Sequence, residues 1–145
     1  MPENPAASAG AREIVTRFHR AILDKSADDL ADLYALDAVH EFPFLAPGMP
    51  ERFHGREEIR AGYRAAWGAT PVEVAEVADV VIHDTAEAGV VVVEQTVLGT
   101  MATTGDPVRI PGIVVLRVRD GHVVHARDYM DGLGVARATG RLSLT

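Results

Sequence analysis

The segment Asp120–Asp131, with the sequence DGHVVHARDYMD, contains the pattern on which the predicted fold depends. Asp120 and Gly121 predict a hairpin turn, and the residues that follow alternate as in a β-strand, where neighbours point to opposite faces. One face carries Val124, Ala126, Asp128 and Met130, and the other carries His125, Arg127, Tyr129 and Asp131. Asp128 is thus the polar member of an otherwise apolar face.

A carboxylate on an apolar face has two interpretations. If that face packs against helices, Asp128 lies in apolar surroundings, which make a carboxyl group a usable acid or base. Alternatively, Asp128 is a structural residue whose oxygens bind an arginine or backbone N–H groups. We favour the functional interpretation, and the structural one stays open.

The predicted strand at 89–101 repeats this pattern with a neutral group. Gln95 shares a face with Val91, Val93 and Val97. An amide in that position could orient a water molecule or a substrate oxygen, or it could bind neighbouring side chains and serve only the structure.

The first predicted strand, residues 39–45, has a titratable residue on each face. Glu41 lies with Val39, Pro43 and Leu45, whereas His40 lies with Phe42 and Phe44. Either Glu41 or His40 therefore accompanies Asp128, depending on which face points inward. A bulge before Pro43 would change the register, so the sequence leaves both open.

The remaining pattern predicts one α+β domain over residues 11–131, with flexible tails at 1–10 and 132–145. Ile14, Phe18 and Ile22 indicate a helix over about 11–24. Ser26 begins a second short helix whose apolar side is Leu30, Leu33 and Tyr34, and a third helix contains Glu57, Ile59, Tyr63 and Trp67. Residues 43–55 are predicted as a loop, and strands are expected at 72–83, 89–101, 108–118 and 122–131.

Composition excludes several functions. The 145 residues include 14 basic and 21 acidic side chains, and this net charge of −7 argues against a nucleic-acid or anionic-membrane partner. The chain has no cysteine and a single lysine, Lys25, so thiol and Schiff-base catalysis are not expected. No residue spacing indicates a metal or nucleotide cofactor. The N-terminus lacks a signal-peptide pattern, and a cytoplasmic protein is expected.

The run DGHVVHARDYMD, the upstream VHEFPF strand and the order of helices resemble the nuclear-transport-factor-2-like superfamily over roughly residues 12–131. The SnoaL-like group of polyketide cyclases, ketosteroid isomerases and limonene-type epoxide hydrolases is the most similar. This resemblance implies a curved antiparallel sheet wrapped over the N-terminal helices, a cone-shaped apolar cavity and a homodimer formed through the outer sheet face.

In the epoxide hydrolases, the aspartate of an Arg-Asp-Tyr run removes a proton from water, and here that run is Arg127, Asp128 and Tyr129. Their middle-strand Arg-x-Asp pair is replaced by Gln95 and Val97. Ketosteroid isomerases place their base just before the proline of the first strand, where this chain has Phe42. These departures favour a cyclase-like reaction over either of those two.

The sequence thus predicts that Asp128 moves a proton on a hydrophobic, carbonyl-bearing substrate without a cofactor or metal. Gln95 and either Glu41 or His40 would stabilise the developing charge. Apolar walls are expected from Phe18, Tyr63, Trp67, Val97 and Met130. An epoxide hydrolase that uses Asp128 to activate water, and a non-catalytic ligand-binding or dimerisation module, are the alternatives.

Overall fold

The computed structural model describes residues 5–46 and 48–140. Its elements in chain order are the helices and strands α1 (Pro5–Asp24), α2 (Ala27–Ala31), β1 (Tyr34–Glu41), β2 (Arg52–His54), α3 (Arg56–Ala69), β3 (Val72–Asp84), β4 (Val90–Met101), β5 (Pro107–Arg119), β6 (His122–Met130) and α4 (Gly132–Ala138). Within these residues, no helix is both long enough and apolar enough to cross a membrane.

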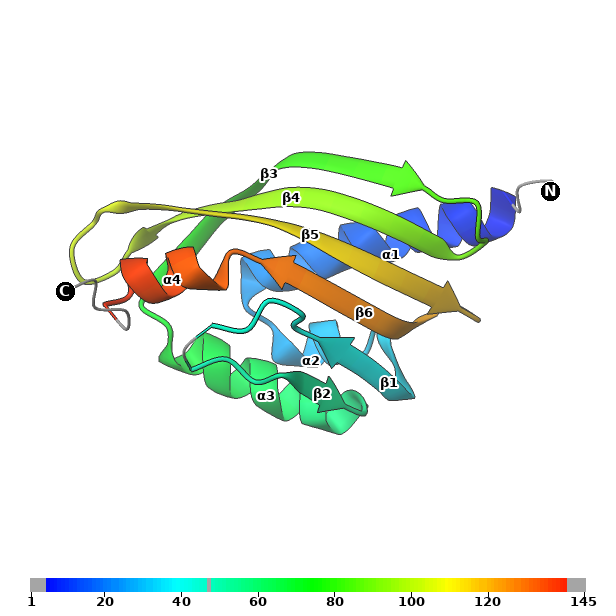
Figure 1. Cartoon of the computed structure of the whole chain (residues 1–145), viewed down its shortest axis with the longest axis horizontal. Coiled ribbons are helices and arrows are strands. Elements are labelled where there is room, and N and C mark those ends of the chain that lie inside the picture. The colour runs from blue at the N-terminus through cyan, green and yellow to red at the C-terminus, as the bar shows by residue number, and fades with distance from the viewer. Residues whose placement is uncertain (1–4, 47, 141–145) are drawn as a thin grey trace.

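All six strands form one curved sheet in the order β2-β1-β6-β5-β4-β3 (Figure 1). The neighbours pair antiparallel except β1 and β6, which run parallel. Helix α1 contacts β3, β4 and β5, whereas α3 contacts β1 and β2. The three N-terminal helices therefore cover one face of the sheet, here called the inner face, and the α+β fold predicted from the sequence is confirmed.

The core lies between α1 and the inner face. Val15 and Phe18 of α1 are buried against Val93 and Val114, which lie directly opposite each other on β4 and β5. Helix α1 then ends at Asp24, and the Ser26 hydroxyl accepts a hydrogen bond of 3.1 Å from the Asp29 N–H at the start of α2. This side-chain cap satisfies one of the free N–H groups of the first turn.

Close contact between strands accompanies the curvature of the sheet. A Cβ atom on Gly99 of β4 would lie 2.0 Å from the Glu73 carbonyl oxygen of β3. On β5, a Cβ atom on Gly112 would lie 3.2 Å from the Met130 Cα. Residue Asp79, with a φ of +54°, lies where the register between β3 and β4 shifts. Glycine and a bulge therefore occur where the strands approach or bend most.

Several predicted boundaries were wrong. Helix α1 begins at Pro5 rather than near residue 11, and Tyr34 begins β1 rather than ending the second helix. The predicted loop 43–55 contains strand β2, which pairs with β1, and the predicted C-terminal tail contains α4. Residues 1–4 and 141–145 of the two predicted tails lie outside the described residues.

The face assignment in β6 also needs one correction. The register between β5 and β6 shifts after the Arg117–His125 pair, so that Val118 pairs with Val123 and Val124 is the extra residue. Consequently Val123, and not Val124, is buried beside Ala126 on the inner face. The bulge lies before Asp128 in the strand and leaves Asp128 on the predicted face.

Candidate active site

His40 and Asp128 meet on the inner face because their strands are parallel neighbours. In the β1–β6 pairing, His40 lies beside Ala126 and Glu41 beside Arg127. Paired residues point to the same side of a sheet, so His40 shares the buried side of Ala126. The imidazole is completely buried, and its Nε2 lies 3.2 Å from the Asp128 Oδ2.

Two tyrosine hydroxyls complete this group of residues, which we call the His40 cluster: Tyr34, His40, Tyr63 and Asp128. The Tyr34 hydroxyl lies 2.7 Å from His40 Nδ1. The Tyr63 hydroxyl, from α3, lies 3.0 Å from His40 Nε2 and 3.5 Å from the Asp128 Oδ2. Both ring nitrogens of the buried imidazole therefore have hydrogen-bond partners, as buried polar groups require.

Electrostatics assigns the protons in the His40 cluster. Burial raises the pKa of Tyr34 and that of Tyr63 well above the ordinary value, and the charge of Asp128 raises both further. Both phenols are therefore neutral donors. With a neutral imidazole, Tyr34 donates to His40 Nδ1, and His40 Nε2–H and the Tyr63 hydroxyl donate to Asp128 Oδ2. Asp128 Oδ1 has no hydrogen-bond partner among the described residues.

Asp128 connects this buried cluster to the surface. Its side chain is 11% exposed, whereas that of His40 is 0% exposed. The surrounding groups are aromatic: the rings of His40 and Phe42 have centroids 4.9 Å apart, and Tyr63 and Trp67 are also separated by 4.9 Å. The site thus presents one carboxylate in a mainly apolar setting, with one oxygen held and the other free.

Glu41 does not join Asp128. It lies on the outer face, where its Oε1 is 2.5 Å from the His125 Nε2. That hydrogen bond lowers the pKa of Glu41 and outweighs the opposing effect of desolvation. Of the two candidates left open by the sequence, the structure places His40 next to Asp128.

Gln95 lies on the inner face but contacts a different residue. Its Oε1 is 2.7 Å from the Nε2 of His19 in α1. His19 was not among the predicted site residues. It follows Val15 by four residues and precedes Ile22 by three, which places it on the buried stripe of the helix. A polar residue on this otherwise apolar stripe is the sequence feature that would have identified His19 as a candidate.

The other predicted contact residues divide into three groups. Phe18 is only 3% exposed and belongs to the core. Tyr63 is part of the His40 cluster, and Trp67 packs on it. Val97 and Met130 are half-buried and share a face with Gln95 and Asp128, respectively.

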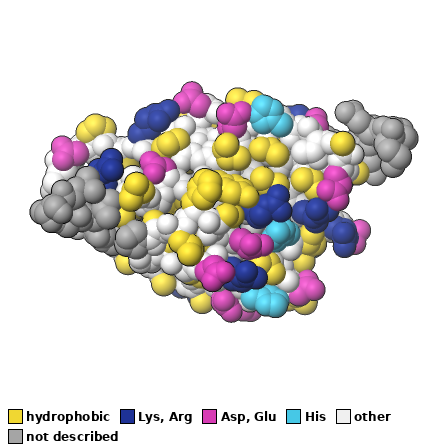
Figure 2. Space-filling view, viewed as in Figure 1, with side chains coloured by type: hydrophobic (Ala, Val, Ile, Leu, Met, Phe, Trp, Pro, Cys, Tyr) yellow, Lys and Arg dark blue, Asp and Glu magenta, His cyan; other side chains and the backbone are white. Residues whose placement is uncertain are grey.

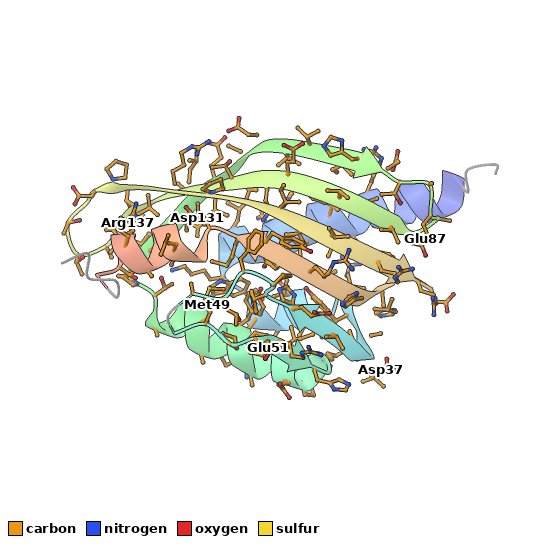
Figure 3. The ribbon with its side chains drawn as sticks, in the orientation of Figure 1. Asp37, Met49, Glu51, Glu87, Asp131 and Arg137 are labelled. Carbon is orange, nitrogen blue, oxygen red and sulfur yellow. The ribbon has the colours of Figure 1, made fainter. Side chains whose placement is uncertain are left out.

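Two hollows in the described part of the chain are not lined by Asp128, whereas the sequence predicts a cone-shaped cavity around that residue. The larger hollow, about 640 Å³, is lined mainly by the outer face of β4–β6, by residues 44–46 and by the start of α4. Gln95 and Met130 also line it. Figure 3 labels Met49 and Asp131 near this side. The smaller, about 340 Å³, lies between α2 and α3 beside Lys25. Among the described residues, no group of three His, Asp or Glu side chains could hold a metal ion.

Comparison with known proteins gives the family. The model of the SnoaL-like domain matches residues 15–126. An uncharacterised PhzA/B-like protein of Pseudomonas aeruginosa is 32% identical over 130 residues, which cover 90% of each chain. A provisionally named isomerase from Bacillus subtilis is 27% identical, with a TM-score of 0.84 and coverage of 96% of this chain and 99% of that one.

More distant structures share the fold. A provisionally named polyketide cyclase from Xanthomonas campestris pv. campestris has a TM-score of 0.71 and 21% identity, covering 94% of this chain and 99% of its own. An LEH-like epoxide hydrolase from M. tuberculosis has a TM-score of 0.62 and 22% identity, covering 92% and 91%. With the family model matching more than three quarters of its length, the chain belongs to the SnoaL-like domain family.

Proposed function

We propose that this protein is a cofactor-independent cyclase or isomerase that performs acid–base chemistry on a hydrophobic, carbonyl-bearing substrate of polyketide type. One observation carries the proposal: His40 and Tyr63 hold one oxygen of the Asp128 carboxylate, and the other oxygen has no partner in the described part of the chain. A group fixed in this way, at the edge of a buried aromatic cluster, suits proton transfer to and from carbon.

The proposed reaction begins when Asp128 Oδ1 removes a proton from the carbon next to the substrate carbonyl. The electron pair of the broken C–H bond moves onto the carbonyl oxygen to give an enolate. Isomerisation follows if Asp128 returns the proton to another carbon. Cyclisation follows if the enolate carbon forms a bond with the carbon of a second carbonyl in the same molecule. The π electron pair of that carbonyl then moves onto its oxygen, which takes the proton held by Asp128. Neither route needs an oxidant or reductant.

Hydrogen exchange in D2O tests this proposal. We use β-tetralone, an apolar bicyclic ketone with an acidic benzylic C–H, and follow the loss of its α-proton signal by NMR against the uncatalysed rate. The wild-type chain should accelerate exchange, and Asp128→Asn should reduce the acceleration by about 10²-fold to 10⁴-fold, which is typical for loss of a general base. Equal rates for the two proteins would contradict the proposed role of Asp128.

His40 and Glu41, the two residues that the sequence offers as partners of Asp128, give opposite expectations in the exchange assay. His40→Leu should reduce exchange because it removes a donor that fixes Asp128. Glu41→Gln should leave the rate unchanged because Glu41 lies on the outer face with His125. A loss of exchange in Glu41→Gln alone would support the alternative sequence interpretation.

An epoxide hydrolase is the second candidate, favoured by the Arg127-Asp128-Tyr129 run and by the fold similarity to the M. tuberculosis epoxide hydrolase. Incubation with styrene oxide in H2¹⁸O would give a diol labelled with one ¹⁸O atom if Asp128 activates water. Absence of both diol formation and tetralone exchange would favour a ligand-binding or dimerisation module.

We also propose that the chain forms a homodimer through the outer face of the sheet. Large apolar side chains are exposed there and along its edge, including Phe44 at 66%, Ile113 at 42% and Leu133 at 51%. Figure 2 shows hydrophobic side chains gathered near the middle of this face, with charged and histidine side chains around them. Such a patch with a polar rim is typical of a protein–protein interface.

A further inference from the structure

We propose that His19 is a positioning residue that holds the Gln95 amide so that the amide nitrogen donates a hydrogen bond to an oxygen of the bound substrate. This inference rests on the proposed function because it assigns a second polar contact to the same inner face. It also narrows the substrate to a flat apolar ketone whose carbonyl oxygen faces Gln95 while Asp128 deprotonates the carbon next to that carbonyl.

The contact itself fixes the orientation of the amide. His19 reaches the sheet from α1, and its Nε2 lies 2.7 Å from the Gln95 Oε1. The carbonyl side of the amide is therefore occupied. Among the described residues, the Gln95 Nε2 makes no hydrogen bond, although an amide nitrogen has two protons to donate. An oriented, unused donor remains on the inner face.

The protonation state of His19 agrees with this orientation. Burial lowers the pKa of His19, an effect that outweighs the opposing hydrogen bond to Gln95. At neutral pH the imidazole is therefore uncharged and carries one N–H. Because Oε1 can only accept, that proton is on Nε2, and the tautomer and the amide orientation determine each other.

The position of Gln95 relative to Asp128 follows from the strand register. Asp128 lies opposite Val114, which lies opposite Val93. Two residues along β4 from Val93, Gln95 lies opposite Gly112, which lies opposite Met130. Gln95 and Asp128 therefore share the inner face on strands separated by β5, at a strand-to-strand distance of about 10 Å.

Gly112 is the residue of β5 between Gln95 and Met130. Because glycine has no side chain, only the backbone of β5 lies between the amide on β4 and the end of β6 that contains Asp128, and a Cβ atom on Gly112 would lie 3.2 Å from the Met130 Cα. A flat apolar molecule that crosses β5 at Gly112 could contact the amide at one end and the carboxylate at the other. An amide donor at that position would stabilise negative charge that develops on a substrate oxygen.

Side-chain NMR tests the positioning without depending on activity. The two Gln95 side-chain amide proton signals, identified by their absence in Gln95→Leu, should move when β-tetralone is added to the wild-type chain. In His19→Leu, the same signals should move closer together and respond less to the ketone, because the amide is no longer held. His19→Gln, which retains an N–H donor, should restore part of the response.

A kinetic cycle then tests whether His19 acts through Gln95. Gln95→Leu should lower kcat for tetralone exchange by about 10²-fold with a smaller change in KM, as expected for loss of a donor to developing charge. His19→Leu should lower kcat by about 10-fold. The double variant should be no slower than Gln95→Leu, because coupled residues have non-additive effects. Additive losses would overturn the proposal.

The two proposals fail differently. If the Gln95 amide signals do not respond to β-tetralone, the inference about His19 and Gln95 is overturned, whatever the exchange rate. If those signals respond but the wild-type chain catalyses no exchange, the inference stands as a binding contact and the proposed proton transfer by Asp128 fails.

Discussion

Tyr34 makes the 2.7 Å hydrogen bond that keeps the His40 imidazole in a single tautomer. Tyr34→Phe would leave the buried Nδ1 without a donor. We expect the free energy of unfolding to fall by about 1–3 kcal/mol, the cost of an unsatisfied buried polar group, measured by urea denaturation. Tyr129→Phe is the matched control because its ring packs on Phe44 and no hydrogen bond of its hydroxyl is found among the described residues. A similar loss in both variants would contradict this account.

The half-buried His19 should make the free energy of unfolding decrease as the pH falls. Burial holds its pKa in the folded chain below the ordinary value of 6.5, so the unfolded chain binds more protons as the pH falls through that value. The free energy of unfolding should therefore decrease below about pH 6.5. In urea denaturation at pH 7.5 and 5.5, His19→Gln should show a smaller decrease than the wild type. An equal decrease in His19→Gln and in the wild type would contradict this account.

The position of Asp128 on the helix-covered face can be predicted from the sequence, because a single charge on an apolar face is visible from alternation alone. The sequence leaves His40 and Glu41 unresolved because both faces of the first strand have the same mixture of residues. Only the parallel pairing with β6, which places His40 beside Ala126, decides between them. That pairing joins two strands that are far apart in the sequence, so the residues of neither strand predict it.

Close approach of β3 and β4 at Gly99 gives a prediction for the strands. In Gly99→Ala, the new methyl group would meet the Glu73 carbonyl oxygen at 2.0 Å, and the backbone would have to separate. We expect a loss of about 1–3 kcal/mol in the free energy of unfolding, as for overpacking elsewhere. Gly68→Ala in α3 is the control, since nothing lies within 4 Å of its Cβ position. Alanine there should increase stability by up to about 1 kcal/mol.

The elements that the sequence misplaces share a physical cause. Leu33 and Tyr34 continue the apolar spacing of α2, but the chain becomes extended at Tyr34 because that residue joins the β-sheet beside Val123. Strand β2 has three residues and gains its stability from pairing with β1. Local propensity does not contain such tertiary contacts, whereas the long apolar alternation of β4 and β5 was sufficient to predict those strands.

For the whole molecule, we predict that two chains form a dimer through the outer face of the sheet. If the outer face is the dimer interface, Ile113→Glu would bury a charge there and should shift the protein from dimer to monomer in sedimentation velocity. Leu36→Glu is the control: Leu36 is 72% exposed and lies next to Asp37, at the end of β1 far from α4 (Figure 3). A wild-type chain that sediments as a monomer would contradict the proposed dimer.

The parallel pairing of β1 with β6 also determines when the site can exist. His40 and Asp128 are 88 residues apart in the chain, and the strands between them must be in place before the two side chains meet. Contacts between distant parts of a chain form late and slow the folding of a domain. During synthesis, a ribosome-bound chain that ends before β6 has the residues of α1–α3 and most of its sheet residues but no His40–Asp128 contact. The protein therefore acquires the proposed chemistry only with its final strand.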